Sequence, residues 1–465
     1  MLEKFANIFR IPDLRKRVLF TMAMLAVYRL GSFIPTPGVN TTALEQFFDL
    51  QGGSALGLVN LFSGGNLRRL TVFALGIMPY ITASIIFQLL TVVYEPLARL
   101  QKEGELGRRK ITQWTRYMTV GLGIVQSLAI ALTLSHGAGG LQLVLNPGPG
   151  FVFMTVITLT TGTTFIMWLG EQITDRGIGN GMSLLIFAGI VVGLPRAIQE
   201  LVETARSEKF GPFTVPALIL LVAAMVAVVV FIVFVERSER RIPVQYAKRI
   251  VGRRMMGGQS THLPLRVNSG GVMPIIFAAS VLSAPLLFAQ SSFVRNSAAL
   301  TRIFDALHAG EPWYEFLYMV AIIFFAYFYI SIVFRPDDIA DNMRKYGGFI
   351  PGIRPGKRTS DFINDILTRI TLVGAIYLIV VAIIPQILIS GIHLNHLWLV
   401  GPLFEHMPLW VTNGLGFNFY FGGTSLLIVV GVAMDTVNQV ESQLIMRHYE
   451  GFTPRSGRIR GRRAW

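Results

Sequence analysis

Cysteine is absent from this chain of 465 residues, and charged residues make up only 14% of it. Without cysteine there is no disulfide bond, no thiolate metal ligand and no cysteine nucleophile. Hydrophobic residues reach 52%, and they gather in runs that are long enough to cross a bilayer. The composition therefore predicts a polytopic membrane protein.

Ionisable residues are also missing from the central parts of the apolar runs, where Asp435 is the one carboxylate well inside a run. Coupled transporters usually carry such groups near the membrane midplane, so this absence counts against a transporter. Asp435 is interpreted as a helix–helix hydrogen-bond partner. His393 and His396 have no nearby carboxylate to complete a metal site, and GIGNG at 177–181 is interpreted as a turn in which Asn180 caps the next helix. We expect neither a metal nor a cofactor.

Ten apolar segments follow one another along the chain, near residues 18–34, 70–93, 115–134, 151–170, 181–195, 215–235, 271–289, 313–334, 364–388 and 423–440. An even number places both termini on one side of the membrane. If that side is the cytoplasm, 33 of the 41 lysines and arginines fall on it, which is the bias expected of cytoplasmic loops. The first segment follows no small-residue cleavage site, so we expect it to be retained.

The stretch 55–93 joins a short apolar piece to a long one. Ala55 to Phe62 provides about two helical turns, too few to cross a bilayer, before Gly64 and Gly65 interrupt it. Leu70 to Val93 is long enough to cross. A broken helix at membrane depth needs protein or a water-filled cavity around its free backbone groups, so the stretch suggests a cavity. A segment lying on the outer membrane surface is the alternative.

Two loops on the basic side, 236–270 and 335–363, are much longer than the usual connections between neighbouring helices. Their lysines and arginines follow from membrane topology alone, so the net charge of +15 does not by itself indicate a nucleic-acid partner. Their length and their glycine and proline residues favour a docking surface for a large cytoplasmic partner over a passive linker.

Pairs of isoleucines one helical turn apart lie in two of the apolar segments, at Ile81 and Ile85 and at Ile186 and Ile190. Each pair shares one helix face. Two such faces are able to form a hydrophobic constriction that closes a pore by dewetting. Ordinary helix packing explains the same spacing, and the spacing alone favours packing.

Six blocks of sequence carry a resemblance that covers nearly the whole chain. They read LFSGGNLRRLTVFALGIMPYITASIIFQLL at 61–90, DRGIGNGMSLLIFAGIV at 175–191, YAKR at 246–249, QSTHLPLRVNSGGVMPIIFA at 259–278, GGFIPGIRPGKRT at 347–359 and FGGTSLLIVVGVAMD at 421–435. In these blocks the sequence closely resembles the SecY family, the channel subunits of the bacterial Sec protein translocase.

The resemblance implies an all-α polytopic fold of ten transmembrane helices, in which two inverted five-helix halves face each other around a central pore. The halves are residues 1–195 and 215–440, joined by an external hinge loop at 196–214 and followed by a basic cytoplasmic tail at 441–465. The implied protein is a protein-conducting channel of the bacterial cytoplasmic membrane, and not an enzyme. It moves unfolded secretory polypeptides across the membrane and releases apolar segments sideways into lipid.

The resemblance also assigns residues to the parts of such a channel. The pore ring maps onto Ile81, Ile85, Ile186, Ile190, Ile276 and Ile428. The plug, at about 55–67, includes Leu58, Asn60, Leu61, Phe62, Gly64 and Gly65. The lateral gate opens between spans two and three on one half and spans seven and eight on the other. We expect a polar seam between spans two and seven that contains Thr82, Ser84, Gln88, Ser280 and Ser283. Pro274 is expected to loosen span seven.

The cytoplasmic loops acquire partners by the same resemblance. Docking of the motor ATPase SecA or of the ribosome maps onto Lys248, Arg249, Arg253, Arg254, Arg354, Lys357 and Arg358. SecE and SecG are the implied companion subunits, and signal sequences, nascent polypeptides and membrane lipids are further partners. A secondary transporter would share an inverted repeat but needs intramembrane charges, and a structural scaffold would explain the loops but not the broken helix.

Overall fold

A computed structural model describes residues 11–50, 60, 63–135, 143–195, 198–199, 202–203, 214–246, 249–251, 254–256, 260–286, 311–390 and 423–450. Every one of the ten apolar segments overlaps a helix in it. In the first half these helices are α2 (Pro12–Gly31), α5 (Met78–Val93), α7 (Glu105–Ser135), α8 (Pro149–Arg176) and α9 (Gly181–Val192). In the second half they are α11 (Thr214–Arg237), α12 (Met273–Leu286), α15 (Pro312–Val333), α17 (Lys357–Ser390) and α20 (Gly423–Glu450).

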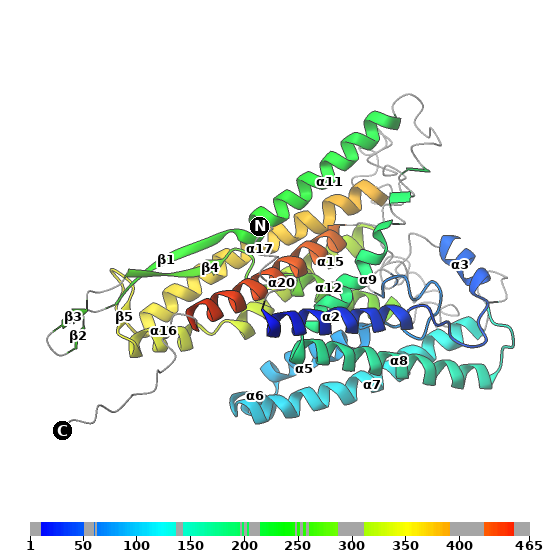
Figure 1. Cartoon of the computed structure of the whole chain (residues 1–465), viewed down its shortest axis with the longest axis horizontal. Helices are drawn as coiled ribbons and strands as arrows, with labels where there is room; N and C mark the ends of the chain where they lie inside the picture. The colour runs from blue at the N-terminus through cyan, green and yellow to red at the C-terminus, as the bar shows by residue number, and fades with distance from the viewer. Residues whose placement is uncertain are drawn as a thin grey trace, which may run out of the picture.

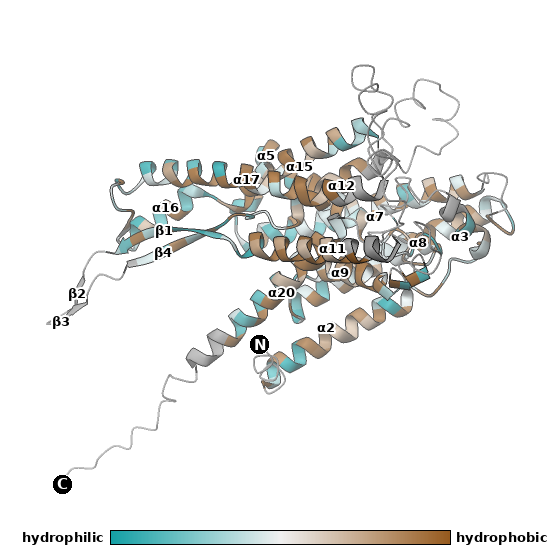
Figure 2. Cartoon of the chain, turned by 90° about the horizontal axis from the view of Figure 1, so that it is seen from above, coloured by the Kyte–Doolittle hydropathy of each residue, from teal (hydrophilic) through white to brown (hydrophobic). Residues whose placement is uncertain are grey.

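Four helical segments in the described part of the chain are long and apolar enough to cross a membrane by themselves, namely Glu105–Ser135, Pro149–Arg176, Pro312–Lys345 and Lys357–Ile384. A fifth span results if α5 is counted together with the short helix α6 (Glu95–Lys102), which is bent from it by 99°. The chain is thus a helical polytopic membrane protein. Figure 2 shows hydrophobic colouring along most of these helices.

The two halves of the chain lie beside each other, with α2, α5, α7 and α8 of the first half below α11, α17 and α20 of the second half in Figure 1, and with α9 next to α20. They meet where α5 packs against α12 and where α9 packs against α20. A further short helix, α3 (Thr41–Leu50), lies at the end of the molecule opposite the strands. The main hydrophobic core is shared by both halves, so it lies at the boundary between them.

The helix predicted from Leu70 begins only at Met78, and the prediction is wrong for its first eight residues. Residues 63–77 form a series of turns. Leu70 has a positive φ of 40° and Gly76 a φ of 56°, which no right-handed helix accepts. Pro79 lies in the first turn of α5, where its missing N–H costs nothing and its fixed φ starts the helix.

Backbone hydrogen bonds hold this turn segment against the end of α2. The N–H of Thr36 donates to the carbonyl of Leu70 at 2.8 Å, and the N–H of Val72 donates to the carbonyl of Ile34 at 2.9 Å. A buried segment that is not helical must satisfy its peptide groups in this way. The segment is therefore a fixed part of the first half.

The loop 236–270 is not irregular, and the all-α prediction is wrong here. It contains β1 (Glu239–Tyr246), β2 (Arg249–Val251), β3 (Arg254–Met256) and β4 (Ser260–Arg266), and β5 (Gly348–Phe349) from the second long loop joins them. The sheet order is β4-β1-β5, all antiparallel, with Ile242 opposite Leu263 and Gln245 opposite Phe349. The hairpin of β2 and β3 lies beyond this sheet at its outer end (Figure 1).

The loop 335–363 is also folded, into α16 (Pro336–Lys345), β5 and the start of α17. Ile242 and Val244 alternate with exposed neighbours on β1, as in a strand with one buried face. They pack with Met343 of α16 and with Ile363 and Leu367 of α17 in a hydrophobic cluster of their own. We call this unit of β1 to β5, α16 and the first turns of α17 the strand arm.

Candidate functional site

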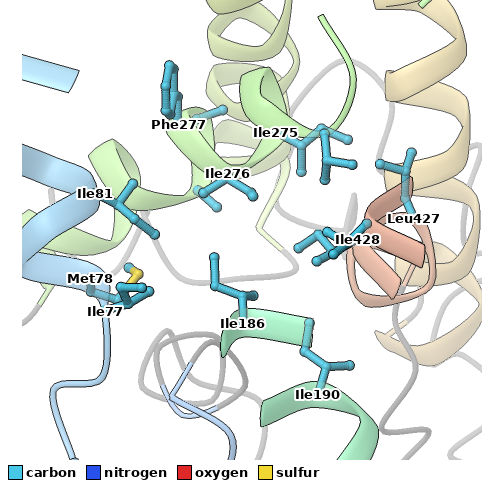
Figure 3. Close-up of a cluster of buried hydrophobic side chains, with 14 of the residues drawn as sticks. Ile77, Met78, Ile81, Ile186, Ile190, Ile275, Ile276, Phe277, Leu427 and Ile428 are labelled. Carbon is cyan, nitrogen blue, oxygen red and sulfur yellow. The ribbon is translucent and has the colours of Figure 1, made fainter. Parts of the chain in front are cut away.

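The six isoleucines of the predicted ring lie in one buried hydrophobic cluster at the boundary between the two halves. They come from α5, α9, α12 and α20, and none is more than 6% exposed. In Figure 3 the side chains of Ile81, Ile186, Ile276 and Ile428 point toward one another. The chain thus brings together Ile81, Ile85, Ile186, Ile190, Ile276 and Ile428 from positions up to 347 residues apart.

A cavity of about 370 Å³ lies against this cluster, between helices of both halves. Ile81, Ile186 and Ile276 form part of its wall, whereas the other three isoleucines of the ring do not line it. Polar side chains that include Ser84 and Gln88 line it as well. The structure therefore separates three isoleucines that line this cavity from three that do not, although all six are buried.

An ion pair lines the same cavity. Nε of Arg116 on α7 lies 2.8 Å from Oε1 of Glu171 on α8, and the Glu171 side chain is only 16% exposed. Asp175 lies one turn further along α8 and also lines the cavity. Partly exposed pairs add little to stability, so the main effect of these groups is to make this wall polar. Sequence reasoning missed them because each lies near a span end, where charge is ordinary.

Asn60 organises the described part of the predicted plug. Its side-chain Oδ1 accepts a hydrogen bond from the N–H of Arg68 at 2.9 Å, and its carbonyl accepts one from the N–H of Gly65 at 2.8 Å. These two bonds close the turn around the glycine pair. Leu58, Leu61 and Phe62 lie outside the described residues.

Gly64 brings the plug turn into direct backbone contact with α9. Its φ is +71°, and a Cβ at this position would lie 2.7 Å from Cα of Gly189. Only glycine accepts both the positive φ and this approach without strain. Gly189 precedes Ile190 of the ring, so the turn packs directly against a helix that supplies the ring.

The sequence predicts a seam of polar side chains between α5 and α12, but most of the hydrogen bonds found for these side chains lie within α5 and do not join the two helices. Oγ1 of Thr82 donates to the carbonyl of Met78, and Nε2 of Gln88 donates to Oγ of Ser84 at 3.1 Å, both within α5. Oγ of Ser280 on α12 reaches across to Sδ of Met78 at 3.9 Å. Thioether sulfur is a weak acceptor, so this contact holds the helices only loosely.

The proline predicted to loosen the seventh span instead begins it. Pro274 is the second residue of α12, where no intrahelical bond is lost. Pro285 lies next to the last residue of the helix. Ser283 lies in α12, but its side chain lies outside the described residues. In the described part of the chain, both prolines therefore lie near the ends of α12 and not at its centre.

Arg354 lies in the turn that leads from β5 into α17, and its side chain is exposed. The hydroxyl of Thr359 donates to the carbonyl of Arg354 at 3.0 Å, and Gly352 and Gly356 supply positive φ values of 82° and 113° on either side. The backbone of the turn thus keeps its shape independently of the arginine side chain.

The other predicted docking residues lie on the same arm. Lys357 and Arg358 are exposed in the first turn of α17. Arg249 belongs to β2 and Arg254 to β3, which pair with each other as a hairpin. The side chains of these two arginines, and the whole of Lys248 and Arg253, lie outside the described residues.

A buried asparagine that sequence reasoning did not single out links the end of α11 to the turn before α12. Nδ2 of Asn268 donates to Oε1 of Glu236 at 2.6 Å and to the carbonyl of Gly271 at 3.1 Å. Nearby, Nη1 of Arg266 lies 3.7 Å from Oδ1 of Asp435. Among the described residues, Asp435 is therefore paired with an arginine at the end of β4, and no hydrogen bond from it to another helix is found. This corrects the sequence interpretation.

Comparisons with known proteins agree over almost the entire chain. The family model described as SecY matches residues 71–437. The protein translocase subunit SecY of Escherichia coli strain K12 is 48% identical over 442 residues, which cover 95% of this chain and 94% of that protein. The protein of the same name from Streptomyces griseus is 47% identical and is covered completely.

Two solved structures share the fold at low sequence identity. The structure of a protein-conducting channel matches with a TM-score of 0.63 at 16% identity, over 95% of both chains. Sec61 in the canine ribosome-channel complex from the endoplasmic reticulum matches with a TM-score of 0.59, also at 16% identity and over 95% of both chains. The chain therefore belongs to the SecY family of protein translocase subunits, which are channels and not enzymes.

Proposed function

We propose that this protein is the protein-conducting channel of a bacterial cytoplasmic membrane, through which unfolded polypeptides cross and from which apolar segments pass sideways into lipid. The observation that carries this proposal is the meeting of isoleucines from four helices at the boundary of the two halves, with a partly polar cavity beside them. A polypeptide crossing hydrocarbon would leave each peptide group unsatisfied, at a cost of several kcal/mol. A wet path on either side of a narrow apolar ring removes most of that cost, while the ring limits leakage of ions.

In this proposal, the ten spans form two inverted halves, residues 1–195 and 215–440. This arrangement is supported by two observations: each predicted segment contains a helix, and the halves meet through α5, α9, α12 and α20. The external loop 196–214 joins the halves. The strand arm and both termini face the cytoplasm, in accord with the excess of lysine and arginine on that side.

The turn around Gly64 and the residues before it act as a plug on the external side of the ring. Its close contact with Gly189 supports this role, because the contact places the turn beside the ring without inserting a side chain between them. The plug leaves this position when a polypeptide enters. No covalent bond changes in the cycle, and the work comes from outside the channel.

The strand arm receives the driving partner, which is the motor ATPase SecA or the translating ribosome. Lys357 and Arg358 support this role, because cations in the first turn of a helix lose rather than gain from the helix dipole and are therefore not explained by the stability of α17. Arginine pairs well with carboxylates on a protein and with phosphates on RNA. The structural relative in a ribosome-channel complex is consistent with such docking. SecE and SecG complete the complex.

Gln88 offers a test of the lateral gate. Replacing Gln88 with leucine removes the Nε2 hydrogen bond to Ser84 and makes one wall of the cavity apolar. We expect the channel's discrimination between intact and defective signal sequences to change. Export of precursors with defective signals should differ about fivefold from the parent, because one net hydrogen bond contributes about 1 kcal/mol. The measurement is export of matched precursors with intact and weakened signals. Gln113→Leu is the control, because Gln113 lies on the exposed face of α7 and does not line the cavity. Equal stringency of both variants and the parent would exclude Gln88 from the gate.

Site-specific photocrosslinking tests the channel itself. A photoreactive residue is placed at Ile81 or at Ile190, in membranes that carry a secretory polypeptide stalled halfway across. We expect crosslinks from both positions to the polypeptide, because both belong to the ring. Crosslinks only to neighbouring helices, while the polypeptide is demonstrably engaged, would show that these isoleucines are core packing and that the path lies elsewhere.

A further inference from the structure

Tyr28 on α2 lies where three parts of the first half meet. Its ring is 5% exposed, and its hydroxyl lies 3.5 Å from the carbonyl oxygen of Ser63, to which it donates. Nδ2 of Asn66 donates to the same hydroxyl at 3.4 Å. Ser63 and Asn66 flank the glycine pair and are themselves buried, at 0% and 3% exposure. One hydroxyl therefore touches the plug turn on both sides of Gly64 and Gly65.

The same hydroxyl also faces α9. A Cβ at Gly189 would lie 3.5 Å from Oη of Tyr28, and Gly189 is the residue that Gly64 approaches. The tyrosine ring stacks on Phe73 with centroids 5.7 Å apart and an angle of 8° between planes. Phe73 belongs to the buried turn segment 63–77. The stacked ring thus fixes the hydroxyl in place, and the hydroxyl lies beside both the plug turn and Gly189 of α9.

Both hydrogen bonds are longer than the usual upper limits of about 3.0 Å for O–H···O and about 3.2 Å for N–H···O bonds, so each is weak. The groups that make them are nevertheless buried, and a buried polar group without a partner is costly. Weak bonds between buried groups keep the plug turn in one position at rest and still allow it to leave when a polypeptide enters. A short, charge-assisted bond would not release so easily.

We propose that Tyr28 is a positioning residue that holds the plug turn against α9 in the resting channel and so sets how readily the plug leaves. The proposal rests on the proposed function, since it assigns the turn to the plug. The tyrosine ring packs against Phe73, and the hydroxyl binds the plug turn.

The complete absence of cysteine makes a direct test possible. Ser63→Cys introduces a unique thiol in the plug turn and keeps the backbone carbonyl that accepts from Tyr28. In the assembled complex in membranes, a membrane-impermeant maleimide added from the outside reports how often the turn leaves its buried position. We expect Tyr28→Phe in this background to speed labelling at rest about fivefold or more, because both weak hydrogen bonds of the hydroxyl are lost while the stack on Phe73 remains.

Two further variants keep the result interpretable. Tyr117→Phe removes a hydroxyl that accepts from Gln113 at 2.9 Å on the exposed face of α7, and it should leave labelling unchanged. Asn66→Ala removes the second contact and should speed labelling like Tyr28→Phe, with less than additive effect in the double variant. Asn66→Ala also replaces Tyr28→Phe as the test if that variant does not accumulate in the membrane.

Unchanged labelling in Tyr28→Phe and in Asn66→Ala, with normal amounts of complex, would overturn the proposal, because packing alone would then hold the turn. This readout follows the position of the turn and does not require that a polypeptide pass the ring. It is therefore separate from the crosslinking test of the channel. Faster labelling without crosslinks at Ile81 and Ile190 would support the holder and reject the conducting path.

Discussion

Replacing Arg354 with alanine is expected to reduce polypeptide transport at least about tenfold while the amount of folded channel in the membrane stays the same. Truncating a charge that is hydrogen-bonded across an interface costs about 2 kcal/mol or more, and about 1.4 kcal/mol corresponds to a factor of ten in affinity. The side chain is exposed, and no hydrogen bond of its guanidinium is found among the described residues. The turn is held by the carbonyl of Arg354 and the hydroxyl of Thr359, which alanine preserves.

The measurements are export of a precursor in membrane vesicles and binding of the motor ATPase or the ribosome to the same vesicles. Arg240→Ala is the matched control, because Arg240 is an exposed arginine on β1 of the same strand arm. We expect it to change export little. Loss of the Arg354→Ala protein from the membrane would assign the residue a structural role, and normal binding with normal export would remove it from the docking surface.

The position of the helices was predictable from the sequence because hydrophobic runs of membrane length have few alternative folds. Asn180 was predictable as well, since its Oδ1 accepts from the N–H of Met182 at 3.1 Å as a helix cap does. These features depend on local chemistry. Residues a few positions apart in the sequence decide them.

The turn segment 63–77 and the strand arm were not predictable in the same way. Leu70 to Ile77 is as apolar as a helix interior, and only the contacts of Leu70 and Val72 with the end of α2 show why it is not helical. On β1 the alternation of Ile242 and Val244 is short and is interrupted by Pro243. Its burial depends on Leu367, more than 120 positions away, so the strand signal is tertiary in origin.

In the candidate site, too, some features follow from local sequence and others only from tertiary contacts. Helical spacing alone selected Ile81, Ile85, Ile186 and Ile190, but it gave no reason to prefer a pore over packing. The structure adds that Ile81 and Ile186 border a cavity together with Ile276. The contacts made by Tyr28 and Asn268 were not visible from the sequence, because each links residues of different elements.

Replacing Ile81 and Ile186 together with serine is expected to raise the resting ion conductance of the channel by a factor of about ten or more. Each change removes about 2 kcal/mol of apolar transfer free energy, at about 0.8 kcal/mol per buried CH₂. A narrow apolar constriction excludes ions by dewetting, so polar side chains at the wall of the cavity favour continuous water. The effect should be greater than for single changes, since the two helices face one gap.

The measurement is ion conductance of the complex in planar bilayers without a translocating polypeptide, together with its melting temperature. Ile173→Ser is the control, because Ile173 is a fully buried isoleucine of α8 in the same hydrophobic cluster but does not line the cavity. It should lower the melting temperature without a leak, since it leaves a cavity and a polar group in the packing. If the ring variants lose stability as the control does and show no leak, these isoleucines are packing residues and the seal depends on the plug alone. A leak in the ring variants at nearly normal stability would separate the two roles, because packing by itself does not determine whether ions cross.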